Sequence, residues 1–296
     1  EHRTLIRRRP NVSNSARGRG AARGREWGNT NEARLMHRRH GVDGRYGRTR
    51  LRRTVPVAIG HRVARRGPVR VVVVNPQKGR VVRAFPTKGA PSGIASSPDG
   101  KRLYVTTGVA DGRILVMNGR TGKIEAQLTA GHSPNSPVVS PDGKTLFVCN
   151  RFTDDVSVFD LDTKKEAWRV PVTREPVAAA ISPDGNWLLV ANLLPKGSAD
   201  SGYVSAVVDI IDTNARNVHA SIALSNGSTD LHGVCVSPDG AHGYVTHILS
   251  RYQLPTTQLE RGWVNTNAVS VIDLTTMTFV NTVLLDDVDM GAANPW

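Results

Sequence analysis

Short apolar runs of about five residues recur along residues 68–296, and polar residues, Gly and Pro separate each run from the next. Runs of this length, rich in Val, Leu, Ile and Thr, are typical of buried β-strands bounded by turns. No apolar period of 3.6 residues, which would predict a helix, extends through this region. The pattern therefore predicts an all-β fold. Four of the runs are LYVTT (103–107), LFVCN (146–150), LLVAN (188–192) and YVTH (244–247).

The tetrapeptide Ser-Pro-Asp-Gly precedes each of these four runs. Its copies begin at Ser97, Ser140, Ser182 and Ser237, at spacings of 43, 42 and 55 residues. Proline presets φ at the first central position of a type I turn, Asp suits the second, and Gly accepts the left-handed position that follows. The tetrapeptide therefore predicts a β-hairpin between two apolar runs.

A second apolar run follows each hairpin and ends in Asp or Asn, after which come a polar turn and one further strand. The terminal residues of these runs are Asn75, Asn118, Asp160, Asp212 and Asp273. We expect their side chains to cap the second turn, as in the Asp-x-x-Thr sequence that begins at Asp160. Each unit thus gives four antiparallel strands in a meander of about 42 residues, which is the size of one β-propeller blade.

The number of repeat units also predicts the number of blades. Residues 69–87 supply two strands, the third and fourth of a blade, and four complete units then extend to about Leu285. The final Asn294-Pro295-Trp296 resembles the start of another inner strand. We therefore expect about 18 strands, or about four and a half blades, in residues 68–296. Because only a closed ring removes all sheet edges, we expect this β-propeller to be incomplete.

The LYVTT, LFVCN and LLVAN runs, with VSVFD or VSVID after them, resemble the YVTN-repeat β-propellers of bacterial and archaeal envelope proteins. The resemblance covers residues 69–296 and implies a seven-bladed ring in the periplasm or at the cell surface. The segment SRYQLPTTQLERGWVNTNAVSVID and the final DDVDMGAANPW further resemble propellers that precede a dihaem cytochrome c peroxidase-like domain. The chain contains no CxxCH motif, so the resemblance implies haem only if a downstream domain exists, and we expect no cofactor in this chain.

One segment carries the net charge of +14. Residues 1–67 contain 19 Arg, no Lys and 4 acidic residues, a net charge of +15, whereas residues 68–296 have a net charge of −1. We expect the Arg-rich segment to be disordered or non-native, because GC-rich DNA read in a wrong frame produces Arg, Gly and Ala. A solvated tail and a basic arm that binds nucleic acid or anionic surfaces are the alternatives. No secretory signal is visible, because the segment lacks an apolar core of about 7–15 residues.

The meander places both hairpin turns of a blade at one end of its strands and the variable connections at the other end. Because loops carry function more often than uniform turns, we expect the ligand or partner site at the variable end. The longest connections there are residues 193–206 and 248–268. The candidate residues are His132, Asn135, His232 and His247 at the rim of the expected central channel, and Arg251, Tyr252, Arg261 and Trp263 in the longer connection.

Histidines at a channel mouth could hold a metal or an anionic ligand, whereas loop histidines that bond backbone groups are the structural alternative. No HxH or HxxxH spacing supports a metal site, and we expect none. The two cysteines, Cys149 and Cys235, form no CxxC motif. We expect both to be small buried residues, since catalysis would need an exposed thiol of low pKa.

These features favour a non-catalytic envelope β-propeller that acts as a protein-interaction or scaffold module through its long connections. The alternatives, by resemblance, are the propeller part of a haem-dependent, cytochrome c peroxidase-like redox protein and a lactonase-like propeller enzyme. We expect no catalytic residues in the chain, and nucleic-acid binding only through residues 1–67. The chain contains no run of 18 apolar residues, so we expect no membrane span.

Overall fold

The short apolar runs form β-strands throughout the part of the chain that the structure describes. The computed structural model describes residues 57–60, 69–108, 110–250 and 265–286. The chain divides into two units, Glu1–Leu51 and Arg52–Trp296, and every described residue lies in the second. Within these described ranges there are nineteen strands and no helix.

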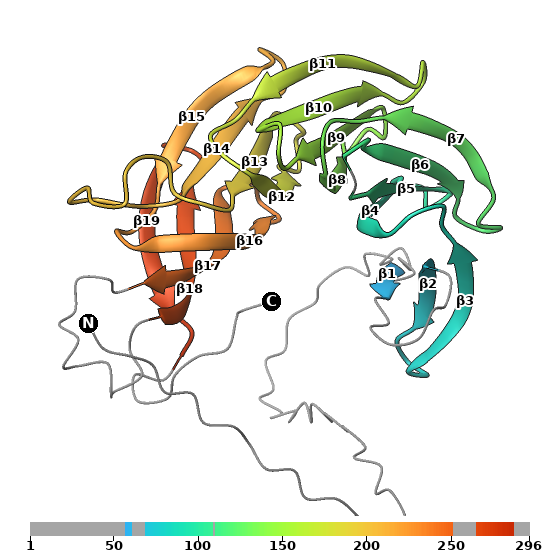
Figure 1. The fold of residues 1–296 in the computed structure, drawn as a ribbon, viewed down its shortest axis with the longest axis horizontal. Coiled ribbons are helices and arrows are strands. Elements are labelled where there is room, and N and C mark those ends of the chain that lie inside the picture. The colour runs from blue at the N-terminus through green and yellow to red at the C-terminus, as the bar shows by residue number, and fades with distance from the viewer. Residues whose placement is uncertain (1–56, 61–68, 109, 251–264, 287–296) are drawn as a thin grey trace, which may run out of the picture. The chain divides into compact units, whose positions relative to one another are not determined.

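The strands form five antiparallel sheets in chain order (Figure 1). The first sheet has three strands, β1 (Val57–Gly60), β2 (Arg70–Asn75) and β3 (Arg80–Pro86). Blade 1 comprises β4 (Pro91–Ser96), β5 (Arg102–Thr107), β6 (Arg113–Asn118) and β7 (Ile124–Thr129), and blade 2 comprises β8 (Pro134–Val139), β9 (Thr145–Asn150), β10 (Asp155–Asp160) and β11 (Lys165–Pro171). Blade 3 comprises β12 (Pro176–Ile181), β13 (Trp187–Asn192), β14 (Val207–Asp212) and β15 (Asn217–Ala223), and blade 4 comprises β16 (Ser228–Val236), β17 (His242–Ser250), β18 (Asn265–Asp273) and β19 (Thr278–Leu284).

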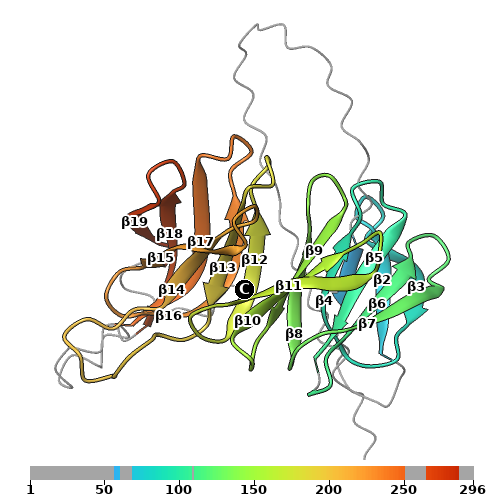
Figure 2. The ribbon, with the colours of Figure 1, turned by 90° about the horizontal axis from the view of Figure 1, so that it is seen from above.

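Neighbouring blades contact one another through their first strands. In Figure 1, β4, β8 and β12 lie toward the centre, and β7, β11 and β15 lie at the outer rim. The inner strands β4, β8, β12 and β16 contact each other in turn, and the blades stand face to face in the view of Figure 2. Four-stranded antiparallel meanders arranged in this way are the blades of a β-propeller, which confirms the predicted fold class.

Each middle blade buries both faces of its sheet, because successive side chains of a strand point to opposite faces. Leu146 and Val148 of β9 pack with Tyr104 of blade 1, whereas Phe147 between them packs with Leu188 of blade 3. All five side chains are at most 2% exposed. A strand that is covered on both faces needs apolar residues at successive positions, and this explains the unbroken apolar runs.

The Ser-Pro-Asp-Gly turns have the predicted geometry. At the turn of blade 2, the Gly143 N–H donates to the Ser140 carbonyl at 2.9 Å, and Gly143 has a left-handed φ of 76°. The Ser140 hydroxyl donates to Asp142 Oδ1 at 2.5 Å, and the Lys144 N–H donates to the same oxygen at 3.0 Å. The turns of the other three blades repeat these bonds.

The second turn of each blade is capped by the side chain that ends its third strand, as predicted. Asp160 Oδ1 accepts the N–H groups of Asp162 and Thr163 at 3.0 and 2.7 Å. Asn118, Asp212 and Asp273 accept the corresponding pairs in the other blades. The end of the molecule that carries both kinds of turn, which we call the turn face, is therefore nearly uniform from blade to blade.

Two strand assignments differ from the expectation. The first sheet has a third strand, β1, which pairs with β2 from Val57↔Val73 to Gly60↔Arg70. It lies inside the Arg-rich segment, and the sequence pattern did not predict it because only four residues, VAIG, form the strand between arginine-rich stretches. In addition, β17 and β18 have nine residues each, so pairing extends to Ser250↔Asn265 and includes both ends of the connection predicted for 248–268.

We predict that the turn carboxylates make stability depend on pH in the acid range. The Ser97 hydroxyl, followed by the Lys101 N–H, lowers the pKa of Asp99 from 3.8 to about 2. Because the folded-state pKa is depressed, this stabilisation is complete above pH of about 4 and is lost as the pH falls toward 2. Asp99→Asn should therefore lower the thermal unfolding midpoint at pH 7, and the difference from wild type should shrink at pH 2.

Thermal unfolding followed by circular dichroism at pH 7, 4 and 2 measures this difference. Ser97→Ala is the matched control, since it removes the same hydrogen bond from the donor side. A difference between wild type and Asp99→Asn that is as large at pH 2 as at pH 7 would contradict the assignment.

Candidate functional site

The polar residues predicted for the inner strands connect one blade to the next. The Asn135 side-chain amide of β8 donates to the Val177 carbonyl of β12 at 3.1 Å. Ser92, at the equivalent position of β4, donates to the Pro134 carbonyl of β8 at 2.5 Å. Asn135 is thus occupied by a contact between blades 2 and 3, and its role in the described structure is to join their inner strands.

His247 does not line a channel, and the prediction that it does is wrong. Its side chain is 0% exposed in β17, with Nε2 2.8 Å from the Ser270 hydroxyl and Nδ1 3.2 Å from the Ile248 carbonyl. A carbonyl only accepts, so Nδ1 carries the proton and Nε2 accepts from Ser270. Burial lowers the pKa of His247, which keeps the ring neutral. The error arises because the side chain lies inside the sheet, bonded to Ser270 of β18, and not at the rim.

The same position carries a buried polar side chain in blades 2 and 3. Asn150 is 0% exposed and donates to Asp155 Oδ1 at 2.6 Å and to the Ser157 hydroxyl at 2.8 Å. Asn192 donates to Asp209 Oδ2 at 3.0 Å. These residues and His247 bond polar groups of the adjacent third strand, so each satisfies a buried donor or acceptor beside the variable connection.

His132 and His232 lie at the end of the strands opposite the turn face, which we call the link face. His132 Nδ1 is 3.0 Å from the Ser133 hydroxyl, and its ring meets the Phe152 ring edge-on with centroids 5.2 Å apart. His232 Nδ1 is 2.9 Å from the Leu231 carbonyl. Partial burial lowers the pKa of His232, which Asp230 opposes and the nearby Arg151 reinforces. Both histidines contact local groups, which agrees with the structural alternative.

The other four candidates, Arg251, Tyr252, Arg261 and Trp263, lie outside the described residues. The described part of the link face nevertheless contains residues that the sequence did not single out. We define the Arg151 patch as His132, Arg151, Phe152, Arg174, Glu175 and His232.

The Arg151 guanidinium is the centre of this patch. Its Nε and Nη2 atoms donate to Glu175 Oε2 at 2.9 and 2.8 Å. Its Cζ atom also lies 4.9 Å from the centroid of the Phe152 ring, within the range of a cation–π contact. Phe152 is 54% exposed despite these contacts. The patch therefore presents an exposed aromatic ring whose position is held by a paired arginine.

The backbone beneath the patch adopts unfavourable conformations. Ser133, Asp154, Glu175 and Asp230 have φ values of 52°, 53°, 47° and 55°, in the left-handed region that favours glycine. Glu175 also precedes Pro176, a position at which extended backbone is preferred. Lys164, Arg216 and Met277, in the second turns of blades 2 to 4, have similar φ values of 57°, 61° and 53°, so left-handed residues occur on both faces.

The long connection 193–206 extends the link face beside this patch. Arg174 Nη1 donates to the Pro195 carbonyl at 3.1 Å, which joins the patch to the connection. Tyr203 in the connection donates its hydroxyl to the Leu224 carbonyl at 2.5 Å, yet its side chain remains 57% exposed. The connection thus adds a second exposed aromatic ring with a fixed position. Phe152 and Tyr203 could have been predicted from the sequence only because they lie in connections whose length and sequence differ from blade to blade.

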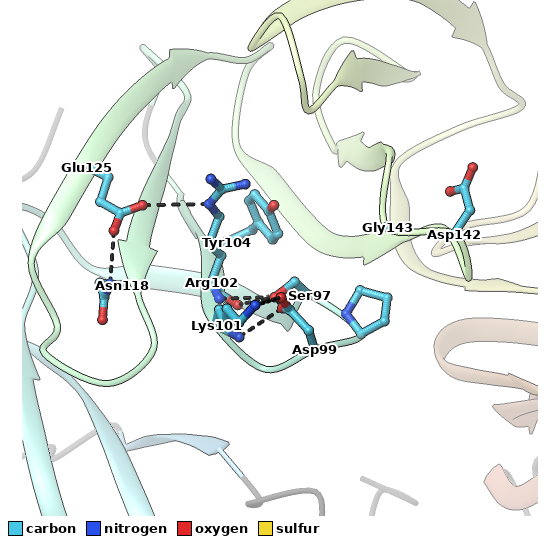
Figure 3. A pocket seen from close by; sticks show the side chains of 10 residues that line it. Ser97, Asp99, Lys101, Arg102, Tyr104, Asn118, Glu125, Asp142 and Gly143 are labelled. Carbon is cyan, nitrogen blue, oxygen red and sulfur yellow. Dashed lines mark hydrogen bonds and ion pairs between the residues drawn. The ribbon is translucent and has the colours of Figure 1, made fainter. Parts of the chain in front are cut away.

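The described pockets lie on the turn face. A pocket of about 470 Å³ between blades 1 and 2 is lined by Ser97, Pro98, Asp99, Lys101, Arg102, Tyr104, Asn118, Glu125, Asp142 and Gly143 (Figure 3). Arg102 and Asn118 both point toward Glu125, at 3.6 and 3.0 Å, and Lys101 pairs with Asp99 at 3.2 Å (Figure 3). A pocket of about 400 Å³ lies between the corresponding turns of blades 2 and 3. The turns that line these pockets repeat from blade to blade, so we place the candidate site on the link face, where the connections differ.

The two cysteines lie in different environments. Burial raises the pKa of the Cys149 thiol to about 12, which keeps it protonated. Cys235 is exposed, so the expectation that it is buried is wrong; it lies on a face of β16 that no described strand covers. No group of three or more His, Cys, Asp or Glu that could hold a metal ion occurs among the described residues. No helix of the described chain is long and apolar enough to cross a membrane.

The sheets and their order define a β-propeller, and comparisons with known proteins agree. Residues 123–194 match the family described as Lactonase, 7-bladed beta-propeller. Hydrazine synthase subunit beta of Kuenenia stuttgartiensis is 34% identical over 121 residues, which are 41% of this chain and 30% of that protein. Antigen Lp49 of Leptospira interrogans serogroup Icterohaemorrhagiae serovar copenhageni is 26% identical over 189 residues, 60% of this chain and 41% of that protein.

A solved structure is similar over a longer part of the chain. Kuenenia stuttgartiensis Hydrazine Synthase superposes with a TM-score of 0.68 at 26% identity and covers 77% of this chain and 63% of the compared chain. The chain spans less than half the length of the two curated relatives. These likenesses support the propeller fold and concern part of each relative.

We predict that His247→Asn reduces the loss of stability on mild acidification. A buried histidine with a lowered pKa resists protonation in the folded state, whereas the unfolded chain binds the proton near pH 6.5. Stability is therefore complete above about pH 6.5 and falls below it. Asn removes this titration and can still bond Ser270, as Asn150 bonds Ser157. The free energy of unfolding should fall by about 1 kcal/mol less in the variant than in wild type between pH 7.5 and 5.

Urea denaturation at the two pH values measures both free energies. His247→Ala is the comparison variant, since it removes the same titration and also leaves Ser270 without this partner. Equal losses of stability in wild type and His247→Asn would show that His247 is not protonated on unfolding in this range.

We predict that Glu175→Gly gives a more stable protein than Glu175→Ala. Both Glu175→Gly and Glu175→Ala remove the ion pair with Arg151, but only glycine relieves the left-handed backbone. The glycine variant should therefore be more stable than the alanine variant by about 1 kcal/mol. At an ordinary strand position the order is the reverse. Chemical denaturation of the two variants gives the difference, and an alanine variant at least as stable as the glycine variant would refute the strain.

Proposed function

We propose that this β-propeller is a non-catalytic interaction module that binds a protein partner through its link face. The observation that carries the proposal is the exposure of two aromatic side chains on the link face, Phe152 at 54%, which lies against Arg151, and Tyr203 at 57%. Aromatic residues and arginine dominate the energy of protein interfaces, because they bury large areas with little loss of conformational freedom. Each ring is held by a contact within the fold: Phe152 lies against Arg151, and the Tyr203 hydroxyl donates to the Leu224 carbonyl.

The uniform turn face and the variable link face support this choice of surface. The turns on one end repeat the same hydrogen bonds in four blades, whereas the connections on the other end differ in length and sequence. Function in repeat folds is carried by the elements that vary. The relative named hydrazine synthase subunit beta is, by its name, one subunit of a larger protein, and this favours a role in association.

We further propose that the protein is a YVTN-type propeller of the cell envelope, in the periplasm or at the cell surface. The YVTN-like strand sequences that follow each Ser-Pro-Asp-Gly turn support this assignment. The lactonase match over residues 123–194 keeps a lactonase-like enzyme as the second candidate. A third candidate is the propeller part of a haem-dependent redox protein, which the resemblance of the final segment favours.

We predict that the double variant Phe152→Ser/Tyr203→Ser binds its protein partner more weakly than wild type does. The immobilised protein is used to capture a partner from an envelope extract, the partner is identified, and the affinity of the purified pair is measured. The double variant should bind at least about tenfold more weakly, since loss of one aromatic anchor costs about 1–2 kcal/mol or more. Val82→Ser/Val280→Ser is the matched control, because it removes two exposed apolar side chains from outer strands.

Two results would contradict the proposal. Equal affinity of wild type and the aromatic double variant would show that the partner does not bind through the link face. Hydrolysis of a small lactone by the purified wild-type chain, measured in a pH-stat, would show that the module is catalytic and favour the second candidate.

A further inference from the structure

The pocket between blades 2 and 3 on the turn face, which we call the Trp168 pocket, has side chains that its counterpart between blades 1 and 2 lacks. Its volume of about 400 Å³ is within the range of small-molecule sites. Its walls come from the first turns of both blades, from β11 and from the second turn of blade 3. The backbone of these turns repeats from blade to blade, so selectivity for a ligand must depend on the side chains that do not repeat.

Trp168 is the first of these side chains. It lies on the outer strand β11, is partly buried, and meets the Phe147 ring edge-on with centroids 6.3 Å apart. Strand register identifies the equivalent residues as Ala126 in blade 1, Ala220 in blade 3 and Asn281 in blade 4. Among the four blades, blade 2 alone therefore has an aromatic ring at this position, and the ring forms one wall of the pocket.

Thr145 keeps the space beside this wall open. It is the fifth residue after the first Ser of its turn, where the other blades carry the larger side chains of Arg102, Trp187 and His242. In blade 3 the ring of Trp187 packs against the ring of His219, with centroids 5.0 Å apart. The blade with the largest residue on its outer strand thus has the smallest at this turn position.

The pocket also contains a donor and an acceptor that the fold does not use. Asn214 donates to Asn186 Oδ1 at 3.0 Å and Asn186 donates to Asp184 Oδ2 at 2.7 Å, so these groups satisfy one another. Among the described residues, no hydrogen bond or ion pair engages the Arg216 guanidinium or Oδ2 of Asp142. The Ser140 hydroxyl and the Lys144 N–H lower the pKa of Asp142, so this carboxylate is ionised at neutral pH.

Arg216 occupies a backbone position that favours glycine. Its φ is 61°, and the equivalent residues of the first sheet and of blade 1 are Gly79 and Gly122. Because Lys164 and Met277 occupy this position in blades 2 and 4, the strain alone does not identify a site. It does mean that Arg216→Gly removes the guanidinium and relieves the turn at the same time.

We propose that the Trp168 pocket binds a neutral hexopyranose ring. One face of such a ring presents C–H groups that pack on an aromatic side chain, and its hydroxyl groups both donate and accept hydrogen bonds. Trp168 supplies the aromatic wall, Asp142 Oδ2 accepts from one hydroxyl, and the Arg216 guanidinium donates to another. The proposal does not depend on the function of the link face.

The charges of the pocket favour a neutral ligand over an ionic one. Asp142 and Asp184 both line it, and hydrogen bonds lower the pKa of each carboxyl, so an anion such as a phosphate would meet two negative charges. Arg216 opposes a cationic ligand in the same way. A polyol ring satisfies the carboxylate and the guanidinium together without carrying a charge itself.

Saturation-transfer NMR on the full chain tests the proposal. The probes are the methyl glycosides of glucose, mannose and galactose in both anomeric forms, with glucose 6-phosphate as the anionic comparison. At least one glycoside should receive saturation at its ring C–H protons, and it should bind wild type more tightly than glucose 6-phosphate does. Comparison with the corresponding free hexose shows whether the anomeric hydroxyl is needed, which distinguishes a free sugar from the end of a glycan.

Trp168→Ala should weaken the affinity for that glycoside at least about tenfold, because it removes the aromatic wall. The variant should fold, since Ala126 and Ala220 occupy the equivalent positions of blades 1 and 3. Trp187→Ala is the matched control, because it removes a tryptophan of blade 3 that does not line the pocket, and it should bind like wild type.

Two further variants alter the pocket without removing Trp168. Thr145→Trp places in blade 2 the residue that blade 3 carries at this position, and it should abolish binding by filling the space. Arg216→Gly should weaken binding several-fold while the thermal unfolding midpoint stays the same or rises. Lys164→Gly is its matched control, since it makes the same backbone change at a turn that does not line the pocket. Circular dichroism of each variant verifies its fold.

Three outcomes would overturn the proposal. Absence of saturation transfer to every glycoside with wild type would show that the pocket takes no neutral hexopyranose. Unchanged affinity in Trp168→Ala and Thr145→Trp would place the sugar elsewhere on the molecule. Tighter binding of glucose 6-phosphate than of any glycoside would show that the pocket selects an anion.

Discussion

The packing of one sheet against the next is the interaction on which the rest of this structure depends. A four-stranded antiparallel sheet with apolar residues on both faces cannot bury them alone, and in this chain each face is covered by a neighbouring blade. Leu146, Phe147 and Val148 show the consequence, since three successive residues of one strand are buried by two different blades. The short turns follow from the same constraint, because they hold each strand at the register that keeps both faces apolar.

Burial on both faces also determines where polar groups can lie. Within the sheets, Asn150, Asn192 and His247 are accommodated because each bonds a polar group of the next strand. Charged side chains also lie on the outer strands, as in the Arg169–Glu166 pair of β11. At the strand ends, carboxylates stabilise the turns on one face, and Arg151 pairs with Glu175 on the other. The two faces of the molecule therefore differ in kind, and the one with variable connections is the better surface for recognition.

The relatives are consistent with this division between a repeated scaffold and a variable face. The similarity to hydrazine synthase and to antigen Lp49 concerns a propeller within longer proteins, and a fold shared at this level permits many activities. The Arg151 patch lies among connections whose length and sequence the blade architecture leaves unconstrained.

The sequence by itself determined the blade, its four strands and both of its turns, because these depend on local rules: apolar runs of strand length, Pro and Gly at fixed turn positions, and Asp or Asn at the cap. Tertiary structure alone decided which polar residues meet. His247 and Cys235 were assigned the wrong exposure, since burial depends on what covers a strand and not on the residue. Arg151 and Glu175 are 24 residues apart and form an ion pair only because two connections converge at one end of the blades. The short strand β1 was missed because its arginine-rich flanks concealed four apolar residues that pairing with β2 stabilises.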